Sequence, residues 1–67
     1  MLLLTLEYDI NYLTCICRLW DTIEQKIKLE SAEISQSELT DYVKIWAKEF
    51  NKDIYSLNHT TGFTKLN

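Results

Sequence analysis

The chain contains no proline and a single glycine, Gly62, among its 67 residues. Because proline and glycine are the residues that most often end regular structure, long stretches lack a strong local signal for a break. No apolar run approaches the roughly 20 residues of a membrane-spanning helix, so the sequence predicts no such span. We therefore expect long uninterrupted elements within one domain, residues 1–67, and no membrane association.

Cysteine is also scarce, and its spacing excludes a disulfide scaffold. Cys15 and Cys17 are two residues apart and would point roughly 200° apart on a helix, where they could not pair. Two such thiols fit a reducing compartment, so we expect a cytoplasmic protein. A structural zinc site needs about four ligands, and the only other good candidate is the distant His59. The sequence predicts no metal and no cofactor.

The charge balance and the polar residues indicate neither polyanion binding nor catalysis. A net charge of −3 gives no electrostatic reason for non-specific binding to nucleic acid or to anionic membranes. His59 would need a nucleophile and an orienting partner to act as a general base, and the sequence presents neither. We expect a protein that is not an enzyme and has no small-molecule substrate.

The first half of the chain has a seven-residue apolar repeat. Such a repeat, with further apolar residues three positions on, is typical of the packing seam of a helix and predicts one over about residues 2–30. A strand over Leu2–Tyr8 is the alternative, since these residues also alternate weakly, but no second strand to pair with it is evident. The seam consists of Leu6, Leu13, Ile16, Trp20, Ile23 and Ile27.

The second half opens on a helix start signal. Ser35 and Glu38 have the spacing of a capping box, and Ile34 and Leu39 that of a hydrophobic staple. A helix is predicted from Gln36 to about Leu57, with polar residues and Gly62 as its stop. Its apolar stripe comprises Leu39, Val43, Trp46, Phe50, Ile54 and Leu57, and its opposite face carries Lys44, Lys48 and Lys52.

These elements predict an all-α fold. The connector Glu30–Glu33 is short, so the two helices should form an antiparallel hairpin, followed by a short C-terminal tail. A lone hairpin has one internal interface and leaves further apolar surface uncovered. A homodimer that forms a four-helix bundle would cover it.

The aromatic residues indicate how such a protein would act. Tyrosine and tryptophan dominate binding hot spots, and uncovered apolar surface marks interaction sites. We expect a small regulator or inhibitor, of the kind common on phages and plasmids, that binds itself and another protein. The expected interface residues are Tyr8, Tyr12, Leu19 and Trp20.

Two other functions remain open. The stripe of Lys44, Lys48 and Lys52 could contact phosphates, which would suit a transcription or nucleoid regulator that binds nucleic acid directly or through a DNA-binding partner. The chain could also be a structural subunit of a larger assembly.

Two short segments resemble known families of regulators. Asp21–Glu24 with Glu33–Ser35 and Glu38–Leu39 resembles the central part of the Hha/YmoA nucleoid modulators, and Ala32–Leu39 resembles the dimerisation hairpin of the SinR/SinI regulators. Each resemblance covers roughly a third of the chain and consists mostly of helix-capping residues. Both imply helices and macromolecular partners, and neither assigns a functional residue.

Overall fold

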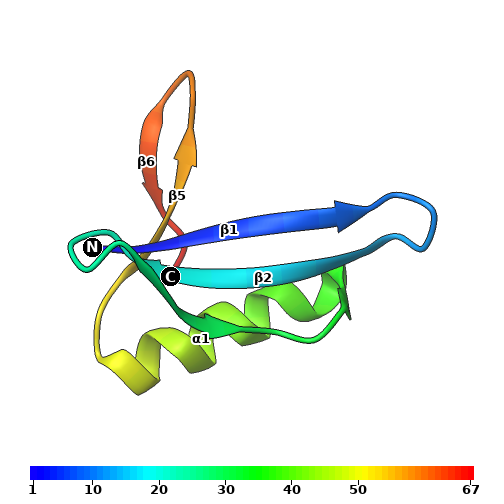
Figure 1. Ribbon diagram of the computed structural model, residues 1–67, viewed down its shortest axis with the longest axis horizontal. Coiled ribbons are helices and arrows are strands. Elements are labelled where there is room, and N and C mark those ends of the chain that lie inside the picture. Colours follow the sequence, from blue (N-terminus) through cyan, green and yellow to red (C-terminus); the bar gives the residue numbers. More distant parts are fainter.

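The computed structural model describes all 67 residues, and it is built mainly of strands. Figure 1 shows a long hairpin of two strands, one helix beneath it, and a second hairpin that projects from the sheet. In chain order the elements are β1 (Leu2–Asp9), β2 (Thr14–Asp21), β3 (Lys26–Glu30), β4 (Ile34–Ser35), the 3₁₀ turn η1 (Gln36–Glu38), α1 (Leu39–Phe50), β5 (Ile54–Asn58) and β6 (Gly62–Lys65).

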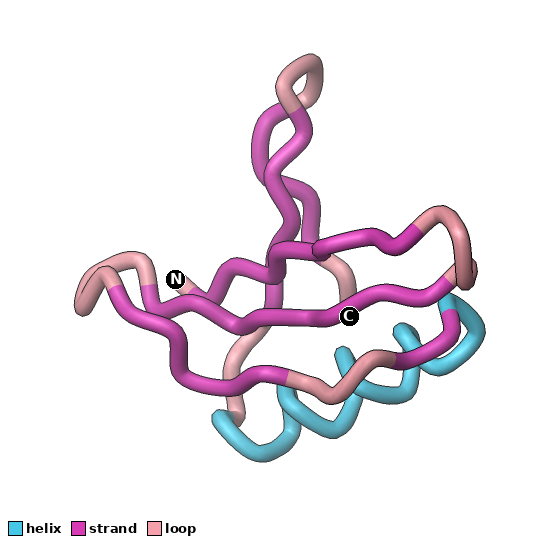
Figure 2. Tube along the Cα trace, turned by 45° about the vertical axis from the view of Figure 1, so that its right-hand side comes forward, coloured by secondary structure: helices cyan, strands magenta, loops and turns pink.

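The strands form one mixed sheet in the order β3-β2-β1-β5-β6, with β4 beside the start of β2. β1 and β2 pair antiparallel along their whole length, from Leu2 opposite Asp21 to Asp9 opposite Thr14. β5 runs parallel to β1 but pairs with it only at Leu2 and Leu3. The helix lies against one side of the sheet, which we call the covered face, and the opposite side is the outer face (Figure 2).

The predicted helix over residues 2–30 is wrong, and with it the all-α fold class and the helical hairpin. These residues form β1, β2 and β3, because period-two alternation governs them. In β2 the buried residues are Cys15, Cys17 and Leu19, and the residues between them are only partly buried. The seven-residue repeat was coincidental, since Leu13 and Ile23 lie in turns. The alternative strand over Leu2–Tyr8 is confirmed, and its partner is β2.

Side-chain oxygens replace proline and glycine in the turns. The Asp9 carboxylate accepts a hydrogen bond from the N–H of Asn11 at 3.0 Å. The Asp21 carboxylate accepts hydrogen bonds from the N–H groups of Ile23 and Glu24 at 2.9 and 3.0 Å. In the β5–β6 turn the side-chain oxygen of Asn58 accepts hydrogen bonds from the N–H groups of Thr60 and Thr61. These local bonds favour turns over helix. Consequently Asp21–Glu24, which resembled a helical family, opens a turn instead.

All three hairpins also end their turns in the same backbone conformation. The residue four positions after the Asp or Asn has a positive φ, 55° at Leu13, 57° at Gln25 and 79° at Gly62. Left-handed backbone is unfavourable for residues with a Cβ. Leu13 and Gln25 therefore adopt it because the strands on either side hold them there.

The core lies between the covered face and α1. Leu19, Ile54, Cys15 and Cys17 are its most deeply buried side chains, with relative exposures of 0–1%. From the helix Val43, Trp46 and Ala47 are buried, and Leu39 and Phe50 pack against them. Trp46 also meets Tyr42 edge-on, with ring centroids 5.4 Å apart. The predicted stripe is thus confirmed as far as Phe50.

The start of the second helix is confirmed, but its predicted end at Leu57 is wrong. Ser35 precedes η1, and its N–H donates to the Glu38 carboxylate at 3.1 Å. At the other end Asn51 has a φ of 51°. Its N–H donates to the carbonyl of Lys48 and the N–H of Lys52 donates to that of Ala47, which is the Schellman pattern. Residues 54–57 then enter the sheet as β5.

A four-helix bundle of two copies is therefore wrong as well, because each copy contributes one α-helix. The predicted C-terminal tail is also incorrect, since Gly62–Lys65 form β6.

The twelve residues of α1 fall short of the length and apolar character that crossing a membrane requires.

Candidate protein-binding interface

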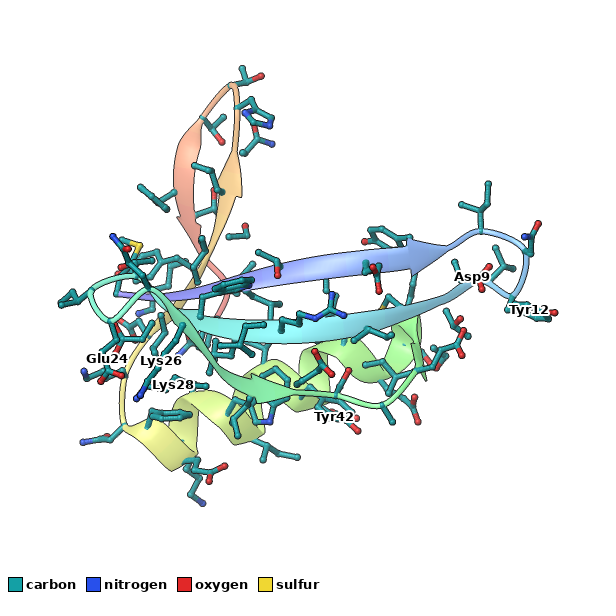
Figure 3. All side chains as sticks on the ribbon, in the orientation of Figure 1. Asp9, Tyr12, Glu24, Lys26, Lys28 and Tyr42 are labelled. Carbon is teal, nitrogen blue, oxygen red and sulfur yellow. The ribbon has the colours of Figure 1, made fainter.

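The four predicted interface residues lie in three different environments. Tyr8, at the end of β1, is 55% exposed, and Tyr12, in the β1–β2 turn, is 74% exposed. The Tyr12 side chain points away from the sheet (Figure 3). Leu19 is fully buried in the core, so it contacts α1 and its neighbours rather than a partner. Trp20 follows Leu19 along β2 and therefore lies on the outer face.

The outer face carries an apolar row that crosses four strands. Trp20 of β2 lies opposite Ile27 of β3 on one side and Leu3 of β1 on the other. Leu3 in turn lies opposite Tyr55 of β5. Adjacent strands are about 4.8 Å apart, so this row of four spans roughly 14 Å. We call these residues the outer row: Leu3, Trp20, Ile27 and Tyr55.

One hydrogen bond fixes the position of Trp20 in this row. Its indole N–H donates to the Thr5 hydroxyl of β1 at 2.8 Å. The ring therefore lies along the strand surface. A shallow hollow of about 330 Å³ is lined by Leu3, Thr5, Trp20, Asp21, Thr22 and Gln25. A partly buried tryptophan held in place beside a hollow is suited to receive an apolar side chain from a partner.

A polar row runs beside the outer row on the same face, two residues along β1 and β2 and three along β3. Arg18 of β2 lies opposite Thr5 and Glu30, and its guanidinium is 2.6 Å from the Glu30 carboxylate and 3.4 Å from that of Glu7. The hydrogen bond to Glu30 is the largest cause that raises the pKa of Arg18 above its ordinary value. An apolar centre flanked by polar groups is the usual anatomy of a protein interface.

The projecting hairpin extends the apolar surface. Leu57 of β5 lies opposite Phe63 of β6, and each is 53% exposed. Leu57 is two residues after Tyr55 on β5 and therefore lies on the same face, as does its cross-strand partner Phe63. The two side chains extend the outer row along the hairpin. In Figure 1 this hairpin stands clear of β1, so one side of it is open to a partner.

The structure also brings the three predicted lysines together, although the helix that was to carry them ends early. Lys44 and Lys48 project from α1, and Lys52 follows the helix end. All three line one hollow of about 340 Å³ with Ala47, Asn51, Asp53 and Asn67. The Asp53 carboxylate also contacts Lys65 at 3.6 Å.

The cysteines and His59 do not come together. Cys15 and Cys17 are buried free thiols on the covered face, whereas His59 lies in the β5–β6 turn. Burial is the main cause that raises the pKa of the Cys17 thiol. Both side chains are buried and contribute to the packing of the core.

A second charged cluster closes the β2–β3 turn. Glu24 lies 3.0 Å from the ammonium of Lys26 and 2.7 Å from that of Lys28 (Figure 3). These hydrogen bonds, above all the one from Lys28, lower the pKa of Glu24. The cluster holds a turn together and lies beside the outer row.

Sequence reasoning missed the outer row because it placed Trp20 and Ile27 on one helix seam with Leu6 and Leu13. The signal that could have found the row is the alternation of Thr14–Asp21, with Asp9 opening the turn before this segment and Asp21 the turn after it.

Comparisons of the chain with protein-family models, with curated proteins and with solved structures find no match.

Proposed function

We propose that the protein is a non-enzymatic binding protein, a small regulator or inhibitor that docks on another protein through the outer face of its sheet. The observation that carries this proposal is the outer row, in which apolar and aromatic side chains of four strands lie side by side with no helix over them. Its mechanism is occlusion, in which the docked face blocks or remodels the surface of the partner.

The partner is expected to present an apolar surface with a polar margin. The outer row supplies the apolar contacts, and Arg18 with its two glutamates supplies charged groups at the rim. Rim charges of this kind contribute to orientation more than to affinity. Two buried free thiols fit a reducing compartment, so the proposal places the protein in the cytoplasm.

Affinity capture with matched variants tests the outer face. Ile27, 42% exposed, is changed to Asp, and the control is Ile45→Asp on the solvent side of α1, where Ile45 is 62% exposed. Proteins that bind the wild type and the control but not Ile27→Asp are candidates, and the purified candidate is then titrated by calorimetry. A loss of at least tenfold in affinity is expected, about 1.4 kcal/mol. Equal binding by the wild type and both variants would show that the partner does not bind at the outer face.

The lysine hollow supports a second candidate function, nucleic-acid binding. Lys44, Lys48 and Lys52 line one hollow, so their charges could act on one phosphate group. Binding to a duplex should then weaken steeply with salt, and Lys48→Glu should weaken it more than Lys65→Glu, which changes the net charge equally. Equal effects of the two variants would indicate a non-specific charge effect and would count against this function.

A further inference from the structure

The edge of β1 from Leu4 to Asp9 is open, unlike its opposite edge. β2 pairs with every residue of β1, whereas β5 pairs only with Leu2 and Leu3 before the β5–β6 hairpin leads away. Figure 1 shows no strand beside the remaining length of β1 on the side away from β2. An open edge presents backbone N–H and C=O groups that can pair with another strand.

The hydrogen bonds of β1 show which residues face this edge. The N–H of Thr22 donates to the carbonyl of Met1 at 3.0 Å, so the peptide groups of Met1 point toward β2. Successive residues of a strand point these groups to opposite sides. Leu3, Thr5 and Glu7 therefore face β2 as well. The residues that direct their N–H and C=O groups to the open edge are Leu4, Leu6 and Tyr8.

The other strands at the margins of the sheet are protected, and β1 is not. β3 carries Lys26 and Lys28, and its pairing with β2 shifts register between Leu19 and Trp20. β6 is four residues long and contains Lys65. Lysines, short strands and irregular pairing are the devices that prevent edge association. Between Leu4 and Asp9 the edge has no basic residue and no proline, and its two acids, Glu7 and Asp9, lie on the outer face.

From these observations we propose that two copies of the chain join antiparallel along β1, with Leu6 of one copy opposite Leu6 of the other. In this register Leu4 pairs with Tyr8 of the second copy, and the reverse pair follows by two-fold symmetry. All three outward-facing residues then exchange backbone hydrogen bonds. The covered-face side chains that meet across the interface are all apolar or aromatic: Leu4, Leu6 and Tyr8.

Neighbouring registers fit less well. A shift of two residues in one direction places Tyr8 of the second copy opposite Leu2, a position that β5 already occupies. A shift in the other direction places Leu4 opposite Ile10, which lies in the turn, so a backbone pair is lost. The Leu6-centred register also keeps acidic residues apart, since Glu7 meets Thr5 of the other copy.

The β1–β2 turn supplies a second contact in the same arrangement. Ile10, at the start of this turn, is 82% exposed. In the dimer, pairing with the second copy ends at Tyr8 opposite Leu4, because β5 occupies the positions of Leu2 and Leu3 that Asp9 and Ile10 would otherwise face. The chain leaves the sheet there, which brings Ile10 to the fork between β1 and β5 of the second copy. A hollow of about 410 Å³ in this fork is lined by Leu3, Leu4, Thr5, Leu6, Ser56 and Leu57. An exposed apolar side chain thus meets a largely apolar hollow, and each copy makes this contact once.

The dimer does not depend on the proposed function, because it uses the edge of the sheet and leaves the outer row free. Its effect on that function would be to join the two outer faces into one continuous surface. The two proposals can therefore fail separately. Ile27→Asp tests the outer face and Tyr8→Lys tests the edge.

Sedimentation equilibrium tests the oligomeric state over a concentration series from micromolar to millimolar. The wild type is expected to approach twice the chain mass of 8.0 kDa. Tyr8→Lys should remain monomeric with an unchanged circular dichroism spectrum, because a lysine at the edge opposes pairing. The control Ile45→Lys, at a site 62% exposed on α1, should dimerise like the wild type. A wild type that stays monomeric throughout would overturn the proposal.

Cysteine cross-linking tests the register. Thr5→Cys and Glu7→Cys are made as separate single variants, mixed and oxidised. In the proposed dimer residues 5 and 7 of different copies form a non-hydrogen-bonded pair with Cα atoms about 4.5 Å apart, within disulfide range. The mixture should give a cross-linked dimer, and each variant alone much less. Cys15 and Cys17 are buried on the covered face and should not react. Cross-links that dominate in one variant alone, or a dimer without cross-links, would contradict the proposal.

Discussion

The two faces of the sheet begin from the same strands and differ in what lies over them. On the covered face Leu19 and Cys17 have no exposed surface, because α1 packs over them. On the outer face Trp20 and Ile27 are only partly buried, and nothing but their cross-strand neighbours surrounds them. Adjacent residues of one strand thus differ in role. Those on the covered face lie in the core beneath the helix, and those on the outer face have no helix over them.

The largest expected effect tests this division at two neighbouring residues. Leu19→Ala should lower the free energy of unfolding by about 2–5 kcal/mol, because it leaves a cavity in a closed core. Trp20→Ala should cost about 1–2 kcal/mol, since only part of the ring is removed from water. Urea unfolding followed by circular dichroism measures both. Equal costs for the two variants would show that the outer face is packed as tightly as the covered one.

A smaller effect is expected from two hydroxyl groups that each serve one face. The buried Ser31 hydroxyl accepts from the Cys17 N–H at 2.9 Å, and the exposed Thr5 hydroxyl accepts from the Trp20 indole at 2.8 Å. Ser31→Ala should cost about 1–3 kcal/mol, because a buried N–H loses its partner. Thr5→Val should change the stability little, because water can replace the hydroxyl.

The same urea titration measures both hydroxyl variants. Ser31→Cys serves as a control for volume. A cost for Thr5→Val that matched the cost for Ser31→Ala would mean that the Trp20 indole is shielded from water, contrary to an open outer face.

The turns at the ends of the strands belong to neither face, and their effects should be smaller still. Leu13→Gly should raise the free energy of unfolding by up to about 1 kcal/mol, because glycine relieves left-handed strain at a site 73% exposed. Gly62→Ala should lower the free energy of unfolding by about 1 kcal/mol, because alanine is strained at the positive φ of this position. The added methyl group would meet only open space, so backbone strain is the sole expected cost. Thermal unfolding measures both, and Tyr12→Gly, beside Leu13, is expected to destabilise. Destabilisation by Leu13→Gly would show that its side chain contributes packing.

The smallest effect concerns pH. Hydrogen bonds from the backbone, first from Glu24, lower the pKa of Asp21 below its ordinary value. The folded state therefore binds this proton less readily than the unfolded state. The resulting stability is present above the ordinary aspartate pKa and is lost as the pH falls through the lowered one.

Thermal unfolding between pH 6 and pH 2 should accordingly show a fall in Tm at the acidic end that is smaller in Asp21→Asn. The asparagine can accept the same backbone bonds without a charge. The matched control is Asp53→Asn, which contributes to no turn of this kind. An identical dependence of Tm on pH in the wild type and in Asp21→Asn would show that Asp21 does not cause the loss of stability in acid.

Local sequence determined part of this structure. The Ser35–Glu38 signal placed the start of the helix, and the spacing of Leu39, Val43, Trp46 and Phe50 identified its buried stripe. Capping bonds and helical periodicity act over a few residues, so a single segment is enough to specify them. Tyr8 and Tyr12 were expected at a partner interface on a helix face; they are exposed at the end of β1 and in a turn instead, and their contact with a partner stays a prediction.

Tertiary structure decided the rest. Whether Leu2–Asp9 is strand or helix depends on a partner strand, and β1 obtains one only when Thr14–Asp21 also extends beside it. The ends of β5 depend likewise on Leu2 and on β6. Strand pairing is non-local, and its hydrogen bonds form between segments rather than within one. The sequence by itself determined one helix and which residues are apolar, whereas only the assembled sheet decided which of them are buried and which lie open on the outer face.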